Sequence, residues 1–134
     1  MHICWGNYEG PHDFDVALET VIATILKARP STLLFEAANP RHEHEWIVWK
    51  AAKLPGDTVL APGLIDTCSN YVEHPELIAQ RLERYIAIVG ADRVLASTDC
   101  GFGTFAGYGK IDPAVAWKKL AALSEGARIA FARL

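Results

Sequence analysis

The chain has few cysteines, no excess of basic residues and no long apolar run, and each shortage excludes a class of protein. Three cysteines, an odd number without an N-terminal export signal, argue against a disulfide framework and favour a reducing cytoplasm. A formal net charge of −3 offers no basic surface for nucleic acid. No apolar run approaches the roughly 20 residues of a membrane span. We therefore expect a cytoplasmic protein with neither nucleic-acid nor membrane partners.

The chain does contain enough apolar material for one core. Its 134 residues are 51% hydrophobic, a size and composition that fit a single domain over residues 1–134. No linker or low-complexity stretch divides this range, so we expect one domain.

Four strand-like segments alternate with helical ones. The expected strands are Met1–Gly6, Ser31–Glu36, Thr58–Asp66 and Arg93–Thr98. The expected helices cover about 14–28, 43–52 and 74–90, and a last helix starts at Asp112–Pro113. Near-continuous apolar strands that alternate with helices predict a parallel sheet. Four such βα units make an α/β fold equal to half of a (β/α)₈ barrel.

Four potential metal ligands stand in or just after three of these strands. His2 and Cys4 are one residue apart in an extended segment, so their side chains face the same side. Glu36 and Cys100 lie at carboxyl ends of strands, where barrel enzymes place their chemistry. One imidazole, one carboxylate and two thiols form a donor set suited to zinc. We predict a zinc cofactor held by these four residues, against the alternative of thiols that are simply packed in a core.

Two aspartates stand at the carboxyl ends of these strands: Asp66 ends the third, and Asp99 directly follows the fourth. Two interpretations of them remain open. They orient a ligand or the substrate as outer-shell acceptors, or they cap the loops that follow. Cys68 lies near the same end, and we expect it in the core or just outside the ligand set.

The sequence RHEHEW, residues 41–46, looks like a second metal cluster. Its histidines and glutamates at positions 42–45 begin a helix, where acidic residues favour the helix dipole, so we expect them on a solvated face. His12 and Asp13 are assigned to a loop on the side of the site, with capping as the competing interpretation.

Four motifs resemble the cobalamin-independent methionine synthase family, especially its short single-barrel members. The matching segments are HICWGNYEGPH, LLFEAANPRHEHEW, LAPGLIDTCSNYVEHPELIAQRL and VLASTDCGFGTFAGYG. They extend over essentially the whole chain but over only the second half of the family's catalytic barrel. The resemblance implies the C-terminal half of a TIM barrel, with zinc at His2, Cys4, Glu36 and Cys100. It also implies methyl transfer from a methylfolate-like donor to the zinc-bound thiolate of homocysteine, which forms methionine.

Two departures from the family pattern limit the implied activity. The barrel half that supplies most substrate contacts in the family is absent, so we expect a homodimer or a separate N-terminal half as partner. We also expect no methionine synthase activity from the chain alone. The proton-transfer histidine that follows the third-strand aspartate in long members is replaced by Cys68, which leaves His74 as a substitute.

Three alternatives stand beside methyl transfer. Relatives that open epoxides with the thiol of coenzyme M indicate alkylation of another thiol by the same zinc chemistry. A half-barrel remnant that only associates with other chains is the alternative without catalysis. A metal-dependent hydrolase barrel is disfavoured, because such folds need a His-x-His pair where this chain has Cys4.

Overall fold

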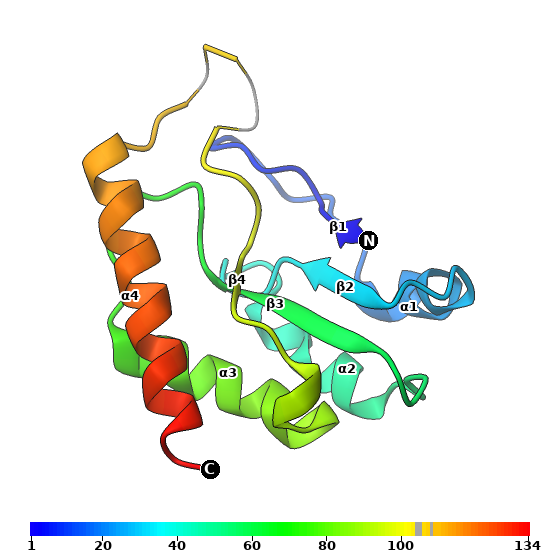
Figure 1. The fold of residues 1–134 in the computed structure, drawn as a ribbon. Coiled ribbons are helices and arrows are strands. Elements are labelled where there is room, and N and C mark those ends of the chain that lie inside the picture. Colours follow the sequence, from blue (N-terminus) through cyan, green and yellow to red (C-terminus); the bar gives the residue numbers. More distant parts are fainter. Residues whose placement is uncertain (104–105, 108) are drawn as a thin grey trace.

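The structure follows the predicted alternation of strands and helices (Figure 1). This computed structural model describes residues 1–103, 106–107 and 109–134. The strands are β1 (His2–Ile3), β2 (Thr32–Phe35), β3 (Val59–Ile65) and β4 (Ser97–Thr98). The helices are α1 (Leu18–Lys27), α2 (Trp46–Ala51), α3 (Pro75–Val89) and α4 (Pro113–Phe131), with short 3₁₀ turns η1 (Glu43–Glu45) and η2 (Ala91–Arg93).

The strands form a parallel sheet in the order β1-β2-β3-β4. Each strand lies beside its predecessor, as in a (β/α)₈ barrel. Leu34 of β2 is the register partner of His2 on one side and of Ala61 on the other. Because all strands run in the same direction, their carboxyl ends meet at one edge of the sheet. The predicted α/β fold with parallel strands is confirmed.

Aromatic packing joins the sheet to the helices. Figure 1 shows α2 and α3 below the sheet and α4 along its left side. Phe35 of β2 stacks on Trp49 of α2 with ring centroids 4.2 Å apart, and Tyr85 of α3 meets Phe35 edge-on at 5.6 Å. All three side chains are buried, and each such burial stabilises the fold by about 1.5–3 kcal/mol.

The predicted starts of the last two helices are confirmed. The His74 Nδ1 atom accepts the Glu76 N–H at 3.1 Å, and Asp112 Oδ1 accepts the Ala114 N–H at 2.7 Å. In both helices proline occupies the first turn, where its missing N–H costs nothing. His74 is therefore the N-cap of α3.

Three predicted boundaries are wrong. β1 is shorter than predicted, and Gly6 ends the extended segment with φ +108°. β4 is shorter than predicted, because Arg93 belongs to the η2 turn and Val94 forms only an isolated bridge with Leu60, so that Ser97–Thr98 alone form the strand. α1 begins late, at Leu18, whose N–H donates to the Glu45 carboxylate at 2.7 Å.

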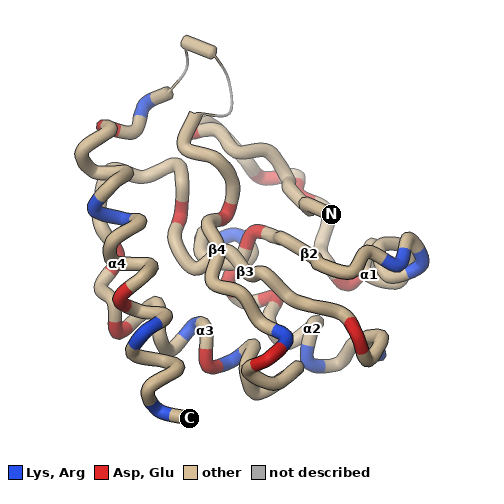
Figure 2. Tube along the Cα trace, in the orientation of Figure 1, with Lys and Arg blue, Asp and Glu red and all other residues tan. Residues whose placement is uncertain are grey.

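Charged residues of both signs lie along α3 and α4 (Figure 2). Arg133, just after α4, pairs with Glu76 at 2.7 Å and with Glu83 at 2.9 Å, and so ties the end of the chain to α3. Among the described residues, no helix is both long enough and apolar enough to cross a membrane.

Candidate metal centre

His2, Cys4 and Cys100 converge at the carboxyl edge of the sheet. Their donor atoms all lie within 4.8 Å of one another. The two sulfur atoms are 3.4 Å apart, and Cys100 Sγ lies 3.5 Å from His2 Nε2. The first two residues come from the segment that begins with β1, and Cys100 comes from the segment after β4. The structure thus brings together three of the four predicted zinc ligands.

Glu36, the fourth predicted ligand, directs one oxygen toward this cluster. Its Oε1 lies 3.6 Å from Cys100 Sγ and accepts the Trp5 N–H at 2.9 Å. Its Oε2 is turned away and accepts from Asn39 Nδ2 at 2.8 Å and from Arg41 at 3.1 Å. Two acceptor sites on Oε2 are therefore filled, and Oε1 retains one toward the thiols.

Asp99 fixes the loop that carries Glu36. Its Oδ1 accepts the N–H groups of Ala37 and Ala38 at 2.8 and 2.9 Å, and its Oδ2 accepts the backbone and side-chain N–H groups of Asn39, both at 3.0 Å. Burial raises the pKa of Asp99 to about 6, although these hydrogen bonds oppose the rise. Asp99 is buried, and its contacts hold the loop after β2 rather than the loop that follows Asp99 itself.

Asp66 also caps a loop. Its Oδ1 accepts the Cys68 N–H at 3.0 Å, and its own N–H donates to Glu73 Oε1 at 2.9 Å. The Cys68 thiol donates to Asn7 Oδ1 at 2.8 Å, and burial raises its pKa to about 11. Cys68 therefore lies outside the group of sulfur atoms around His2.

A cavity of about 290 Å³ opens beside Glu36. The cavity is lined by Asn7, Tyr8, Glu9, Gly10, His12, Glu36, Asn39, Pro40, Arg41, Asp66 and Cys68. The cavity therefore joins the β1 segment, the loop after β2 and the loop after β3. His12 lies on this side of the molecule, as predicted for its loop.

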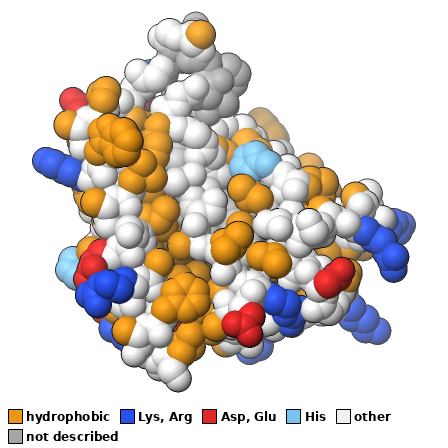
Figure 3. Space-filling model, in the orientation of Figure 1, with side chains coloured by type: hydrophobic (Ala, Val, Ile, Leu, Met, Phe, Trp, Pro, Cys, Tyr) orange, Lys and Arg blue, Asp and Glu red, His pale blue; other side chains and the backbone are white. Residues whose placement is uncertain are grey.

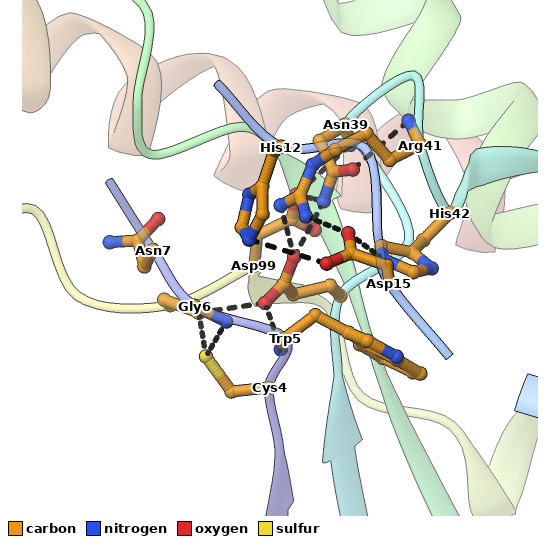
Figure 4. A network of polar contacts seen from close by, with 12 residues as sticks. Cys4, Trp5, Gly6, Asn7, His12, Asp15, Asn39, Arg41, His42 and Asp99 are labelled. Atoms are coloured by element: carbon orange, nitrogen blue, oxygen red, sulfur yellow. Dashed lines mark hydrogen bonds and ion pairs between the residues drawn. The ribbon is translucent and has the colours of Figure 1, made fainter. Parts of the chain in front are cut away.

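A partly buried polar network surrounds Asp15 (Figure 4). His42 Nε2 lies 3.1 Å from Asp15 Oδ2 and His12 Nε2 lies 3.2 Å from Asp15 Oδ1, while Arg41 also pairs with Asp15. The other nitrogen of His42, Nδ1, lies 2.8 Å from Glu45 Oε2. The His42 ring stacks on Trp5 with centroids 4.0 Å apart.

This network corrects one prediction. His42 and Glu45 are buried, with 3% and 5% exposure, so a solvated face is the wrong description of them; it holds for the exposed His44. Burial alone would lower the pKa of His42, but its hydrogen bonds to Glu45 and Asp15 raise it above the ordinary value. The same contacts with His42 and Arg41 hold the pKa of Asp15 below its ordinary value, against the effect of burial.

The donor set fits a divalent cation. Burial, the neighbouring Cys4 thiol and Glu36 all raise the pKa of Cys100. Without a cation the Cys100 thiol therefore stays protonated at neutral pH, and a bound metal reverses this preference. Thiolates, imidazoles and carboxylates are all ligands that zinc accepts, usually four in a tetrahedron, and this cluster offers two thiols, one imidazole and one carboxylate.

The fold and the cluster together define a class: half of a TIM barrel with a His-Cys-Glu-Cys group at the carboxyl ends of its strands. No family model matches the chain. The chain is 30% identical to 2-hydroxypropyl-CoM lyase from Xanthobacter autotrophicus (strain ATCC BAA-1158 / Py2), over 99% of this chain and 40% of that protein. It also resembles the structure of a B12-independent methionine synthase from Shewanella sp. W3-18-1 in complex with selenomethionine.

The structural match to the methionine synthase has a TM-score of 0.73 at 22% identity, and it covers 98% of this chain and 38% of that one. It confirms the half-barrel fold. Together the two matches confirm the resemblance to the methionine synthase family and its coenzyme M relatives that the motifs indicated. The chain spans about two fifths of each relative.

Several residues of the site were not predicted from the sequence. Trp5, Asn39 and Arg41 hold Glu36 through hydrogen bonds, and Asp15 balances the charge of Arg41. Asn39 and Arg41 follow Glu36 in the loop after β2. Their closeness in sequence to a predicted ligand could have marked them as residues of the site. Asp15 lies two residues after Asp13, in the loop that was predicted on the side of the site, but the residue itself was not singled out.

Proposed function

We propose that this chain provides the zinc-binding half of an enzyme that alkylates a thiol. The observation that carries the proposal is the convergence of His2, Cys4 and Cys100, with donor atoms within 4.8 Å, beside one oxygen of Glu36. Zinc bound there would hold a substrate thiol as a thiolate near neutral pH, which makes the sulfur a nucleophile.

Glu36 is suited to be the exchangeable ligand. Hydrogen bonds from Asn39 and Trp5 and the charge of Arg41 occupy three of its acceptor sites. These contacts draw electron density from the carboxylate and weaken it as a ligand relative to the thiolates. At a bound zinc, a substrate sulfur would then join the ligand set or displace Glu36, while His2, Cys4 and Cys100 would stay in place.

The preferred reaction is methyl transfer to homocysteine. A sulfur–carbon bond forms as the nitrogen–carbon bond of a methylfolate-like donor breaks, and the leaving nitrogen takes up a proton. The cavity of about 290 Å³ beside Glu36 gives a thiol room to approach, and its volume lies near the lower end of the usual range of about 300–1,000 Å³ for ligand sites. The methionine synthase relative supports this reaction class.

Alkylation of a coenzyme M type of thiol is the second candidate, and the similarity to 2-hydroxypropyl-CoM lyase favours it. There the thiolate forms its bond to an epoxide carbon, the carbon–oxygen bond breaks, and the oxygen takes up a proton. Cobalt-substituted protein distinguishes the two candidates, because a thiolate that joins the metal adds a charge-transfer absorption band. Homocysteine should produce the band at lower concentration than 2-mercaptoethanesulfonate; the reverse order would favour the second candidate.

The proposal includes a partner that completes the barrel. Trp117 of α4 and Leu95, beside β4, are 73% and 55% exposed, and hydrophobic side chains gather over α4 in Figure 3. Open sheet edges and exposed apolar groups favour association. A second copy of this chain, or a separate chain of four βα units, would cover them. We expect no turnover from the chain alone.

Zinc content tests the proposal. We expect about one zinc per wild-type chain after purification without chelator, and loss of that zinc in Cys100→Ser. Cys68→Ser is the matched control, because Cys68 lies outside the cluster, and it should retain zinc. Well-folded wild-type protein that takes up no zinc would refute the proposal.

A further inference from the structure

Lys119 lies on α4 with no exposed surface, a rare position for a lysine. Its Nζ donates to Glu73 Oε2 at 2.8 Å, to the Tyr71 carbonyl at 2.5 Å and to Ser69 Oγ at 3.4 Å. It also lies 5.2 Å from the centre of the Tyr71 ring. All three acceptors come from the loop between β3 and α3, so one buried cation gathers this loop onto α4.

Glu73 connects Lys119 by hydrogen bonds to residues that line the cavity. Its second oxygen, Oε1, accepts the Asp66 N–H at 2.9 Å, and Asp66 in turn accepts the Cys68 N–H at 3.0 Å. Cys68 and Thr67 donate to Asn7 Oδ1 at 2.8 and 2.9 Å. A continuous set of hydrogen bonds therefore runs from α4 to the segment that carries Cys4.

We propose that Lys119 and Glu73 are positioning residues, which hold the loop 66–73 so that Asp66 and Cys68 line the cavity beside the metal centre. An apolar pair of similar volume would stabilise the fold at least as well as a buried ion pair. The ion pair instead supplies directed hydrogen bonds that select one loop geometry. The consequence for catalysis rests on the proposed function, whereas the restraint on the loop does not.

Two variants separate loop position from stability. Lys119→Met leaves the Glu73 carboxylate buried and unpaired, so it weakens the whole fold. The double variant Lys119→Met/Glu73→Gln removes both charges, and its unfolding midpoint should return toward that of the wild type. Lys118→Met is the matched control, because Lys118 is the exposed neighbour on the same helix.

Alkylation of Cys68 by iodoacetamide, followed by peptide mass spectrometry in zinc-loaded protein, reports the loop. We expect the Cys68 rate to rise at least about tenfold in both variants through local opening, and to stay at the wild-type value in Lys118→Met. A wild-type Cys68 rate in the folded double variant would overturn the proposal. Should Lys119→Met fail to fold, the double variant alone decides.

Zinc content, measured on the same samples, keeps the two proposals apart. Faster Cys68 alkylation in the variants of a protein that takes up no zinc would support the loop restraint and refute the proposed function. Unchanged Cys68 alkylation in variants that bind zinc would refute the loop restraint and leave the proposed function supported.

Discussion

At the scale of single residues, Arg41 shares its guanidinium between two carboxylates, Glu36 and Asp15. Glu36 has 2% of its side chain exposed and Asp15 has 16%, so neither is well solvated. Two buried carboxylates close together repel each other unless a cation lies between them. The positive charge of Arg41 therefore allows the carboxylate of Glu36, a proposed zinc ligand, to lie near the carboxylate of Asp15.

Replacement of Arg41 tests this role. We expect Arg41→Gln to lower the free energy of unfolding of metal-free protein by about 1–3 kcal/mol, because it leaves buried charges unpaired. The loss should be smaller with zinc, because the metal then neutralises Glu36. Urea unfolding with and without zinc measures both values. Arg84→Gln, at a more exposed 3.7 Å pair with Glu43, is the control and should change stability by less than about 1 kcal/mol. Equal losses with and without zinc would contradict the account.

His42 predicts a pH dependence of stability. Its pKa in the folded protein is raised above the ordinary value of about 6.5, so its contribution to stability is fully present below that value and is lost as the pH rises through the folded pKa. The wild type should therefore lose stability relative to His42→Gln as the pH rises above about 6.5. Urea unfolding over this pH range provides the measurement.

His44→Gln is the control for His42, since His44 is exposed. It should retain the pH dependence of the wild type. If the free energy of unfolding of His42→Gln changes with pH as steeply as that of the wild type, the raised pKa of His42 is not the cause of the pH dependence.

At the scale of elements, β3 and the segment after β4 lie unusually close together. A Cβ atom added at Gly63 of β3 would come within 2.5 Å of the Asp99 Cα atom. Asp99 binds the loop of Glu36, and Cys100 follows it directly. The absence of a side chain at Gly63 therefore lets the segment that carries Cys100 lie directly against β3.

Gly63→Ala tests this spacing. We expect it to destabilise the protein by about 2–3 kcal/mol through overpacking and to weaken zinc binding, because Asp99 and Cys100 must shift. Gly56→Ala is the control, since nothing lies within 4 Å of an added Cβ there. Thermal unfolding and competition for zinc with a chelator measure the two effects. Full stability in Gly63→Ala would contradict the close approach.

The alternation of elements was predictable from the sequence because apolar periodicity reflects local geometry. Their ends were less predictable: α1 begins where the Glu45 carboxylate accepts the Leu18 N–H, a contact between residues 27 positions apart. The proposed ligands were recognisable by residue type at strand ends. The burial of His42 was missed because Trp5 and Asp15 cover it, and both are distant in sequence.

At the scale of the whole molecule, four strands are half of what a closed barrel requires. β1 and β4 are the outer strands of the sheet, and an open parallel sheet exposes backbone groups that can pair with another chain. Two copies related by a twofold axis along the barrel would place β4 of each beside β1 of the other. Eight strands would then close.

Self-association tests this arrangement. We expect the wild type to sediment at about twice the 14.7 kDa mass of the chain, and Leu95→Lys, beside β4, to shift it to monomer, because a charge at a sheet edge opposes pairing. Ile47→Lys is the control, since Ile47 is equally exposed on α2. A wild type that stays monomeric at every concentration would contradict edge pairing between copies and leave a separate partner chain.

X-ray absorption at the zinc edge is the decisive test of the proposed metal centre. We expect two sulfur ligands at about 2.3 Å and two nitrogen or oxygen ligands at about 2.0–2.2 Å in wild-type protein loaded with one zinc. The added thiol of homocysteine should raise the sulfur count to three as it joins or replaces Glu36. A first shell without sulfur, or one that homocysteine leaves unchanged, would contradict a thiol-activating zinc centre in this chain.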